Sequence, residues 1–245
     1  MSVEEKPLFS ISRWTPSWRL PEFAPLVGFM LCAALSFVFV RIADEMVEGE
    51  TRAFDETLLR ALRDPSNLKQ PIGPAWLETA MIDLTGLGGV PTLTLITALV
   101  VIYLLVSRRF ANAALVVLSI SGGAVLINIL KASFARPRPE VVDHLVSVQS
   151  LSFPSGHAMS SAVVYLTLGA LLARTERRPA VRGYIFAVAV FLTLLIGVTR
   201  VYLGVHYPTD VLAGWALGAA WALLCWLVAR LLRPKDNETV VPAPR

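Results

Sequence analysis

Three short polar stretches interrupt an otherwise apolar sequence, and they hold the residues with the clearest chemistry. They span residues 131–139, 154–157 and 199–210, and each borders a long apolar segment. Between them they supply lysine, arginine, histidine and aspartate side chains. Cations and imidazoles together are suited to binding and transferring a phosphate group, because phosphoryl transfer depends on positioning and charge stabilisation.

The first stretch gathers three cations at the end of an apolar segment. Lys131, Arg136 and Arg138 lie close together, and Pro137 and Pro139 directly follow the two arginines. A residue before proline is biased away from the helical conformation, so a helix is expected to end here. Guanidinium groups match phosphate oxygens as planar forks, whereas lysine acts as a point charge. Taken alone, the stretch is equally typical of an anchor for lipid headgroups.

The second stretch is expected to open a helix. Pro154 suits the first helical turn, and Gly156 lets a ligand approach the backbone closely. Free amide groups and the positive end of the helix dipole would favour an anion at this point. Pro154-Ser155-Gly156 also fits an ordinary helix start, but His157 in the first turn of a membrane helix indicates a function.

The third stretch places a histidine four residues before a carboxylate. Pro208 predicts the start of another helix, with Asp210 in its first turn and His206 just before it. The carboxylate can hold one imidazole nitrogen and leave the other with its lone pair exposed, as in a nucleophile with an orienting partner. The alternative is a simple histidine–aspartate cap of the helix. Arg200 adds another cation near the start of this stretch.

Taken together, the three stretches resemble the motifs of the type 2 phosphatidic acid phosphatase (PAP2) superfamily in order and in spacing. The matching residues are Lys131-x6-Arg138-Pro139, then Pro154-Ser155-Gly156-His157, then Arg200-x5-His206-x3-Asp210. Thr199 stands where the family usually has serine, and it retains the hydroxyl group. The motif region covers residues 131–210, and the resemblance extends to the spans around it and to a Phe54-Asp55 segment.

The resemblance implies a role for each of these residues. Phosphate would be held by the side chains of Lys131, Arg138 and Arg200 and by the amides of Ser155 and Gly156. His206 would attack phosphorus and form a phosphohistidine, Asp210 would orient His206, and His157 would protonate the leaving group. No metal and no cofactor are expected. Arg136 lies outside the fixed motif positions and is expected to be an auxiliary headgroup contact, and His144 a surface residue.

The composition independently predicts a membrane protein. Of the 245 residues, 55% are hydrophobic and 16% are charged, whereas a soluble domain carries about a quarter charged residues. The net charge of +4 is attributed to arginines on cytoplasmic loops rather than to nucleic-acid binding. Cys32 and Cys225 lie in apolar segments and are expected to be small buried side chains, not a disulfide or a metal site.

Six apolar segments are long enough to cross a bilayer, so the fold class is expected to be an all-α, six-span transmembrane bundle. The segments are 23–40, 89–106, 111–130, 158–173, 184–199 and 211–232, and the fourth and fifth should extend into their flanking motifs. The first is interpreted as a retained span rather than a signal peptide. The domain organisation would be a cytoplasmic segment 1–22, a phosphatase domain 23–232 and a cytoplasmic, disordered tail 233–245.

The distribution of basic residues predicts the orientation. With the N-terminus in the cytoplasm, 13 of the 22 lysines and arginines fall on the cytoplasmic side. All three polar stretches then face outward, across what we expect to be a bacterial inner membrane. Lys131, Arg136, Arg138 and Arg200 oppose the general charge bias there, which favours a functional explanation for them.

The first outer loop contains an apolar stripe at helical spacing. The stripe consists of Phe54, Leu58, Leu59 and Leu62, and the charged residues Asp55, Glu56, Arg60 and Arg63 are expected elsewhere on the helix. The segment is therefore predicted to be an amphipathic helix, either lying on the outer membrane surface or capping the bundle.

The leading hypothesis is a phosphatase acting on a lipid phosphate at the bilayer. Candidate substrates are polyprenyl diphosphate, phosphatidic acid, phosphatidylglycerol phosphate and glycolipid phosphate. One alternative is a phosphotransferase that passes the phosphate from His206 to a second lipid. Another is a non-catalytic protein that binds lipid phosphates, which the presence of His157, His206 and Asp210 disfavours. Soluble vanadate-dependent haloperoxidases share the motifs, but six spans argue against them. The oligomeric state is left open.

Overall fold

The structure is a computed structural model, and it describes residues 20–232. Residues 1–19 and 233–245 lie outside the described part of the chain, and with them nearly all of the expected cytoplasmic segment 1–22 and the whole of the expected tail 233–245. The first helix begins at Leu20, three residues before the predicted start of the first span.

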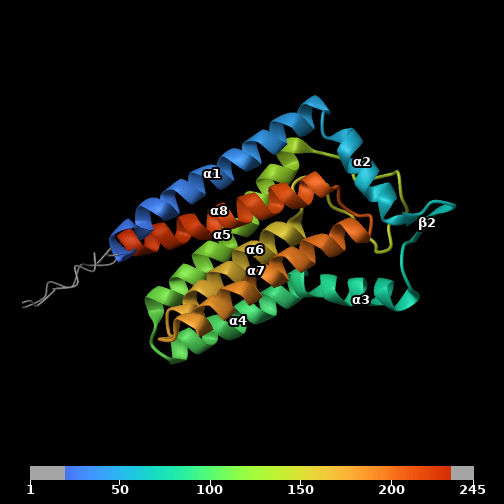
Figure 1. Ribbon diagram of the computed structural model, residues 1–245. Helices are drawn as coiled ribbons and strands as arrows, with labels where there is room; N and C mark the ends of the chain where they lie inside the picture. The colour runs from blue at the N-terminus through green and yellow to red at the C-terminus, as the bar shows by residue number, and fades with distance from the viewer. Residues whose placement is uncertain (1–19, 233–245) are drawn as a thin grey trace, which may run out of the picture.

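The described residues form eight α-helices and one short hairpin (Figure 1). The helices are α1 (Leu20–Glu48), α2 (Arg52–Ala61), α3 (Ala75–Thr85), α4 (Val90–Val106), α5 (Phe110–Phe134), α6 (Gly156–Ala173), α7 (Pro179–Tyr202) and α8 (Pro208–Leu231). A 3-10 turn, η1 (Gly86–Gly88), joins α3 to α4. The strands β1 (Arg63–Asp64) and β2 (Asn67–Pro71) pair in antiparallel fashion and were not predicted.

Five of these helices, α1, α5, α6, α7 and α8, are long and apolar enough to cross a membrane. The helix α4 has 17 residues, and it qualifies only together with the segment Ala75–Gly88, from which it is bent by 45°. The predicted all-α membrane bundle is confirmed, and it has six spans when this bent pair is counted as one. The predicted extension of the fourth and fifth spans into their motifs is also confirmed, since α6 begins at Gly156 and α7 continues to Tyr202.

The helix α6 lies in the middle of the bundle, where it packs against α5, α7 and α8 (Figure 1). Two glycines of α8 allow the closest of these contacts. A Cβ atom at Gly214 would lie 2.8 Å from the carbonyl oxygen of Ser155, and one at Gly218 would lie 2.6 Å from that of Met159. Small residues let membrane helices approach backbone to backbone. This contact fixes the beginning of α8 against the beginning of α6, and both carry predicted site residues.

All three polar stretches lie at one end of the bundle. That end comprises the last turns of α5 and α7 and the first turns of α6 and α8, and it is covered by α2 and the hairpin (Figure 1). The start of α1 and the end of α8 lie together at the opposite end (Figure 1). Up-and-down connection of the spanning helices therefore brings residues from distant parts of the sequence to one membrane face.

The helix α2 caps the bundle instead of lying wholly on a membrane surface. It buries Asp55 and Leu59, while Phe54 and Leu58 remain half-exposed. Asp55 and Arg63, which were expected off the apolar stripe, are both buried, since Asp55 is 0% and Arg63 1% exposed. The reason is polar pairing inside the protein: the Arg63 guanidinium donates to the carbonyl oxygen of Tyr202 at 2.9 Å, which ties the hairpin to the end of α7.

Candidate active site

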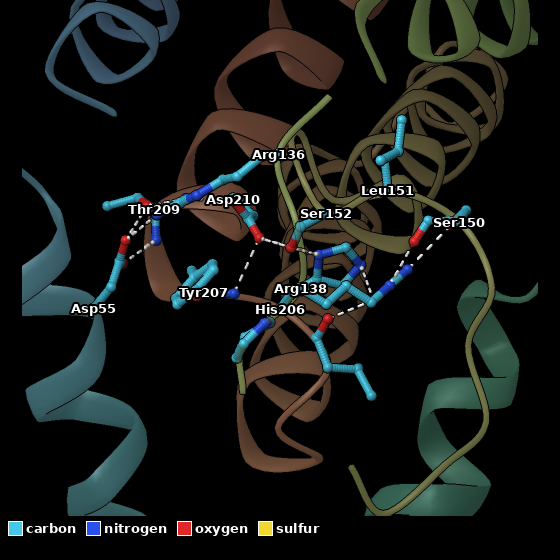
Figure 2. Close-up of polar contacts among 12 residues, drawn as sticks. Asp55, Arg136, Arg138, Ser150, Leu151, Ser152, His206, Tyr207, Thr209 and Asp210 are labelled. Atoms are coloured by element: carbon cyan, nitrogen blue, oxygen red, sulfur yellow. Dashed lines mark hydrogen bonds and ion pairs between the residues drawn. The ribbon is translucent and has the colours of Figure 1, made fainter. Parts of the chain in front are cut away.

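His206 and Asp210 are buried next to each other where α8 begins. Nδ1 of His206 lies 3.3 Å from Oδ2 of Asp210, and both side chains are almost fully buried. The backbone N–H of Tyr207 donates to the same carboxylate oxygen at 3.0 Å. The hydroxyl of Ser152 donates to it as well and lies 3.4 Å from Nδ1 (Figure 2). The carboxylate thus holds Nδ1 as the protonated nitrogen, and Nε2 keeps its lone pair.

Nε2 of His206 faces the guanidinium group of Arg138 at 3.3 Å (Figure 2). Burial lowers the pKa of His206 to about 4, although the hydrogen bond and the charge of Asp210 act in the opposite direction. The imidazole is therefore neutral at physiological pH, as a nucleophile must be.

This neutrality predicts the acid side of the pH profile. The acid limb of kcat/KM reports the free enzyme, so its midpoint should lie near pH 4 and well below the ordinary histidine value of about 6.5. The measurement is kcat/KM from about pH 3 to pH 8, corrected for the second ionisation of the substrate phosphate, whose pKa is about 6. A corrected limb that stays near 6.5 would contradict a buried, neutral nucleophile.

Two predicted cations are held by the loop that precedes α6. Nε of Arg138 donates to the carbonyl oxygen of Ser150 at 2.6 Å, and its guanidinium also donates to the Ser150 hydroxyl and to the carbonyl oxygen of Val205. The Lys131 ammonium donates to the carbonyl oxygen of Leu151. The segment containing Ser150, Leu151 and Ser152 therefore positions both cations as well as the Asp210 carboxylate.

Arg200 approaches the site from the last turn of α7. It is 3% exposed, and one of its terminal nitrogens donates to the Thr85 hydroxyl at 3.0 Å. Its Nε is buried without a hydrogen-bond partner within residues 20–232, and so is the hydroxyl oxygen of Ser155. Leaving a buried donor unpaired costs about 1–3 kcal/mol. A phosphate oxygen is the kind of acceptor that would satisfy both groups, so their chemistry fits the predicted phosphate site.

The structure places the second motif slightly differently from the prediction. The helix begins at Gly156 with Ser155 as its N-cap, so Pro154 precedes the first turn instead of forming it. The Ser155 amide, expected to hold phosphate, donates to the carbonyl oxygen of Asp210 at 2.9 Å. Ser155 therefore offers its hydroxyl group rather than its amide. Gly156 packs beside Lys131, since a Cβ atom there would lie 3.7 Å from the lysine Cε.

His157 lies in the first turn of α6, close enough to the other predicted residues to experience their charges. The charges acting on it are those of Arg200, His206, Arg138 and Lys131. The bend between α3 and α4 packs against its ring, because a Cβ atom at Gly88 would lie 3.3 Å from Cδ2 of His157. The structure therefore brings both motif histidines and the three motif cations into one site.

Arg136 does not extend toward a headgroup as expected. Its guanidinium forms ion pairs with Asp210 at 2.6 Å and with Asp55 at 2.8 Å, and it lies 4.1 Å above the Tyr207 ring (Figure 2). Asp55 also accepts hydrogen bonds from the Thr209 backbone N–H and hydroxyl. Arg136 thus joins the carboxylate of Asp210 to a second buried carboxylate on α2, that of Asp55.

Breaking this network should destabilise the fold. Arg136→Gln leaves two buried carboxylates without their cation, and loss of one partner of a buried pair costs about 3–5 kcal/mol. Asp55→Asn combined with Arg136→Gln should recover part of that loss, giving a coupling energy of about 1–3 kcal/mol. Thermal unfolding of the single and double variants in detergent measures this coupling energy.

Glu56→Gln is the matched control on α2, since Glu56 pairs with the exposed Arg52, and this substitution should not change the unfolding temperature measurably. Additive losses would show that Asp55 and Arg136 act separately.

The reasoning from sequence missed several residues that hold the site. Ser150, Ser152, Thr85 and Asp55 all contact predicted residues through hydrogen bonds or ion pairs. Asp55 carried one signal, because the Phe54-Asp55 segment was part of the resemblance to the family. The three others carried none, since isolated serines and threonines in a loop or at a helix end are ordinary.

Known proteins resemble this chain in sequence and in overall fold. The model of the PAP2 superfamily matches residues 112–233. Phosphatidylglycerophosphatase B of Bacillus subtilis is 31% identical over 192 residues, which cover 76% of this chain and 88% of the relative. Lipid A 1-phosphatase of Rhizobium johnstonii is 34% identical over 116 residues, 42% of each chain. The crystal structure of a transmembrane PAP2-type phosphatidylglycerolphosphate phosphatase from Bacillus subtilis matches with a TM-score of 0.75 and 27% identity, covering 83% of this chain and 98% of that one.

Proposed function

The chain belongs to the PAP2 superfamily and is a membrane-embedded lipid phosphatase, and from this premise we propose that it hydrolyses the terminal phosphomonoester of a glycerophospholipid through a phosphohistidine on His206. One observation carries the proposal: a buried, neutral His206, held by Asp210, faces a group of cations. Next to it, Nε of Arg200 and the hydroxyl oxygen of Ser155 are buried without a hydrogen-bond partner among residues 20–232. Phosphatidylglycerol phosphate is the first substrate to test, because a relative aligned over 76% of this chain is a phosphatidylglycerophosphatase.

The first chemical step forms the phosphoenzyme. Lys131, Arg138 and Arg200 bind the phosphate oxygens and neutralise the charge that develops on them. The lone pair on Nε2 of His206 attacks phosphorus while the bond from phosphorus to the lipid oxygen breaks. His157, protonated beside the bound phosphate, gives its proton to that leaving oxygen. Asp210 accepts the Nδ1 hydrogen bond and stabilises the positive phosphoimidazole.

The second step reverses the role of His157. Now neutral, it takes a proton from water as the water oxygen attacks phosphorus. The bond from phosphorus to Nε2 breaks, inorganic phosphate leaves, and both histidines return to their starting states. None of these residue roles requires a metal ion, so metal independence remains a prediction of the mechanism.

Phosphate release from purified protein tests this function. We expect release from phosphatidylglycerol phosphate and phosphatidic acid in detergent with excess chelator, and slower release from a polyprenyl diphosphate. Phosphate that appears only when an acceptor lipid becomes phosphorylated would instead establish the phosphotransferase alternative. Absence of release from all three lipids would contradict the proposed hydrolysis and favour the lipid-phosphate-binding alternative.

We further propose that the site faces outward from a bacterial inner membrane, with both chain ends in the cytoplasm. The support is the excess of basic residues at the opposite end of the bundle, which includes Arg108, Arg109, Arg174 and Arg182. A reporter fused after Arg245 should be active in the cytoplasm and inactive outside it. The reverse result would place the active site on the cytoplasmic face.

A further inference from the structure

A large apolar cavity lies at the end of the bundle opposite the active site. Its volume is about 800 Å³, within the range of about 300–1,000 Å³ that is typical of ligand pockets. Its walls come from the first turns of α1 and α7, the beginning of α5, and the last turns of α6 and α8. Apolar side chains from these helices line it, including Val27, Leu31, Leu166, Ala170, Phe186 and Leu223.

Three arginines also line this cavity. Arg174 follows the end of α6, Arg182 lies in the first turn of α7, and Arg230 lies in the last turn of α8, 5.5 Å from the Trp226 ring. Arg174 and Arg182 are exposed and form no ion pair with any residue in the range 20–232. The nearest acidic residue in their loop, Glu176, is engaged with the backbone N–H groups of Arg177 and Arg178 at 2.7 Å and 2.9 Å.

Besides its arginines, the cavity has walls that are open to the bilayer. Phe23, Val27, Leu31 and Phe186 are each between 42% and 53% exposed, so its α1 and α7 walls are open to lipid chains. We propose that this cavity binds an anionic phospholipid of the leaflet opposite the active site, with an acyl chain against the apolar walls and the phosphodiester headgroup on the arginines. Basic pockets between membrane helices are known to hold anionic headgroups in this way.

This lipid is distinct from the substrate. The helix α6 has 18 residues and is about 27 Å long, and it separates the arginines from the cations of the active site. One phosphate group cannot contact both ends. A phosphodiester lipid such as phosphatidylglycerol also lacks the terminal phosphate that the active-site cations would hold, so it makes a suitable probe.

The test compares two pairs of arginines from the same loop. Detergent-purified protein is titrated with dioleoyl phosphatidylglycerol and, separately, with dioleoyl phosphatidylcholine, and the bound lipid is counted by native mass spectrometry. We expect wild type to retain phosphatidylglycerol in preference to phosphatidylcholine, and Arg174→Gln with Arg182→Gln to weaken its binding at least tenfold. Arg177→Gln with Arg178→Gln removes the same charge from residues that do not line the cavity, and it should leave binding unchanged.

Three results would overturn the proposal. Equal weakening by both arginine pairs would mean that the loop attracts anionic lipid only through its net charge. Equal retention of phosphatidylcholine would mean that the cavity takes any acyl chain. Removal of residues 233–245 should not alter the affinity, and a rise in affinity would show that the chain's own C-terminal residues occupy the cavity. Lipid counting does not depend on turnover, so the inactive His206→Ala variant should give the same result as wild type.

Discussion

His206→Ala should abolish turnover of every lipid phosphate, by at least about 10³-fold, because removal of a covalent nucleophile leaves only the contribution of substrate binding. The alanine also removes the only group that can carry the phosphoryl intermediate in the proposed mechanism. Rapid quenching with ³²P-labelled substrate should therefore trap an acid-labile phosphoenzyme in wild type and none in the variant. Substrate binding should survive, since Lys131, Arg138 and Arg200 are held by other contacts.

His144→Ala is the matched control for this experiment. It removes the same side chain from an exposed position in the loop, where Nε2 of the ring lies 2.7 Å from the carbonyl oxygen of Pro139. Turnover and phosphoenzyme should both stay near wild type. Asp210→Asn should resemble a weakened His206 variant, because it loosens the ring and removes the charge that stabilises the phosphoimidazole. Labelled phosphohistidine in His206→Ala would show that another residue is the nucleophile.

The residues of the three motifs could be predicted because each motif is local. Spacing alone puts His206 and Asp210 on either side of one helix start, where a carboxylate four residues on can reach the imidazole. The apolar segments likewise predicted the spans, since length and hydropathy are properties of a continuous stretch. The number of spans between the three polar stretches also predicted that all three lie at the same membrane face.

The supporting contacts could not be predicted, because they join segments that no local pattern relates. Asp55 pairs with Arg136, 81 residues away, and with Thr209, 154 residues away. Helical spacing predicted α2 but not which of its polar residues turns inward, since that depends on where Arg136 lies. Spacing placed Asp55 off the apolar stripe, and it could not show that the side chain is buried. Ser152 contributes to the site only because the loop before α6 folds back over His206.

The predicted start of α6 and the predicted role of the Ser155 amide were wrong for a different physical reason. A proline was expected in the first turn of α6, yet the helix begins at Gly156, and the Ser155 amide is used to bind α8. The close approach of α6 to α8, which requires Gly214 and Gly218, makes that amide unavailable to a ligand. Helix packing therefore decides which donors of a motif remain open, and a single sequence does not show it.

His157→Ala should slow the hydrolysis of lipid substrates by about 10²–10⁴-fold, the usual contribution of a general acid. The leaving group of a lipid phosphate is an alkoxide, a strong base that needs a proton as its bond to phosphorus breaks. p-Nitrophenolate is a much weaker base and can leave without that proton. The first turnover of p-nitrophenyl phosphate should consequently be far less affected by His157→Ala than the first turnover of a lipid.

The second step should then expose the other role of His157. Water must still lose a proton when it attacks the phosphohistidine, so His157→Ala should hydrolyse the intermediate slowly even after an easy first step. Stopped-flow measurements should show a rapid burst of p-nitrophenol equal to the enzyme concentration, followed by slow steady turnover, with phosphoenzyme accumulating in parallel. Wild type should show a smaller burst and less phosphoenzyme than His157→Ala, because its hydrolysis step is faster. A defect of equal size in the first turnover of both substrates would mean that His157 binds or positions the phosphate and is not the proton donor to the leaving group.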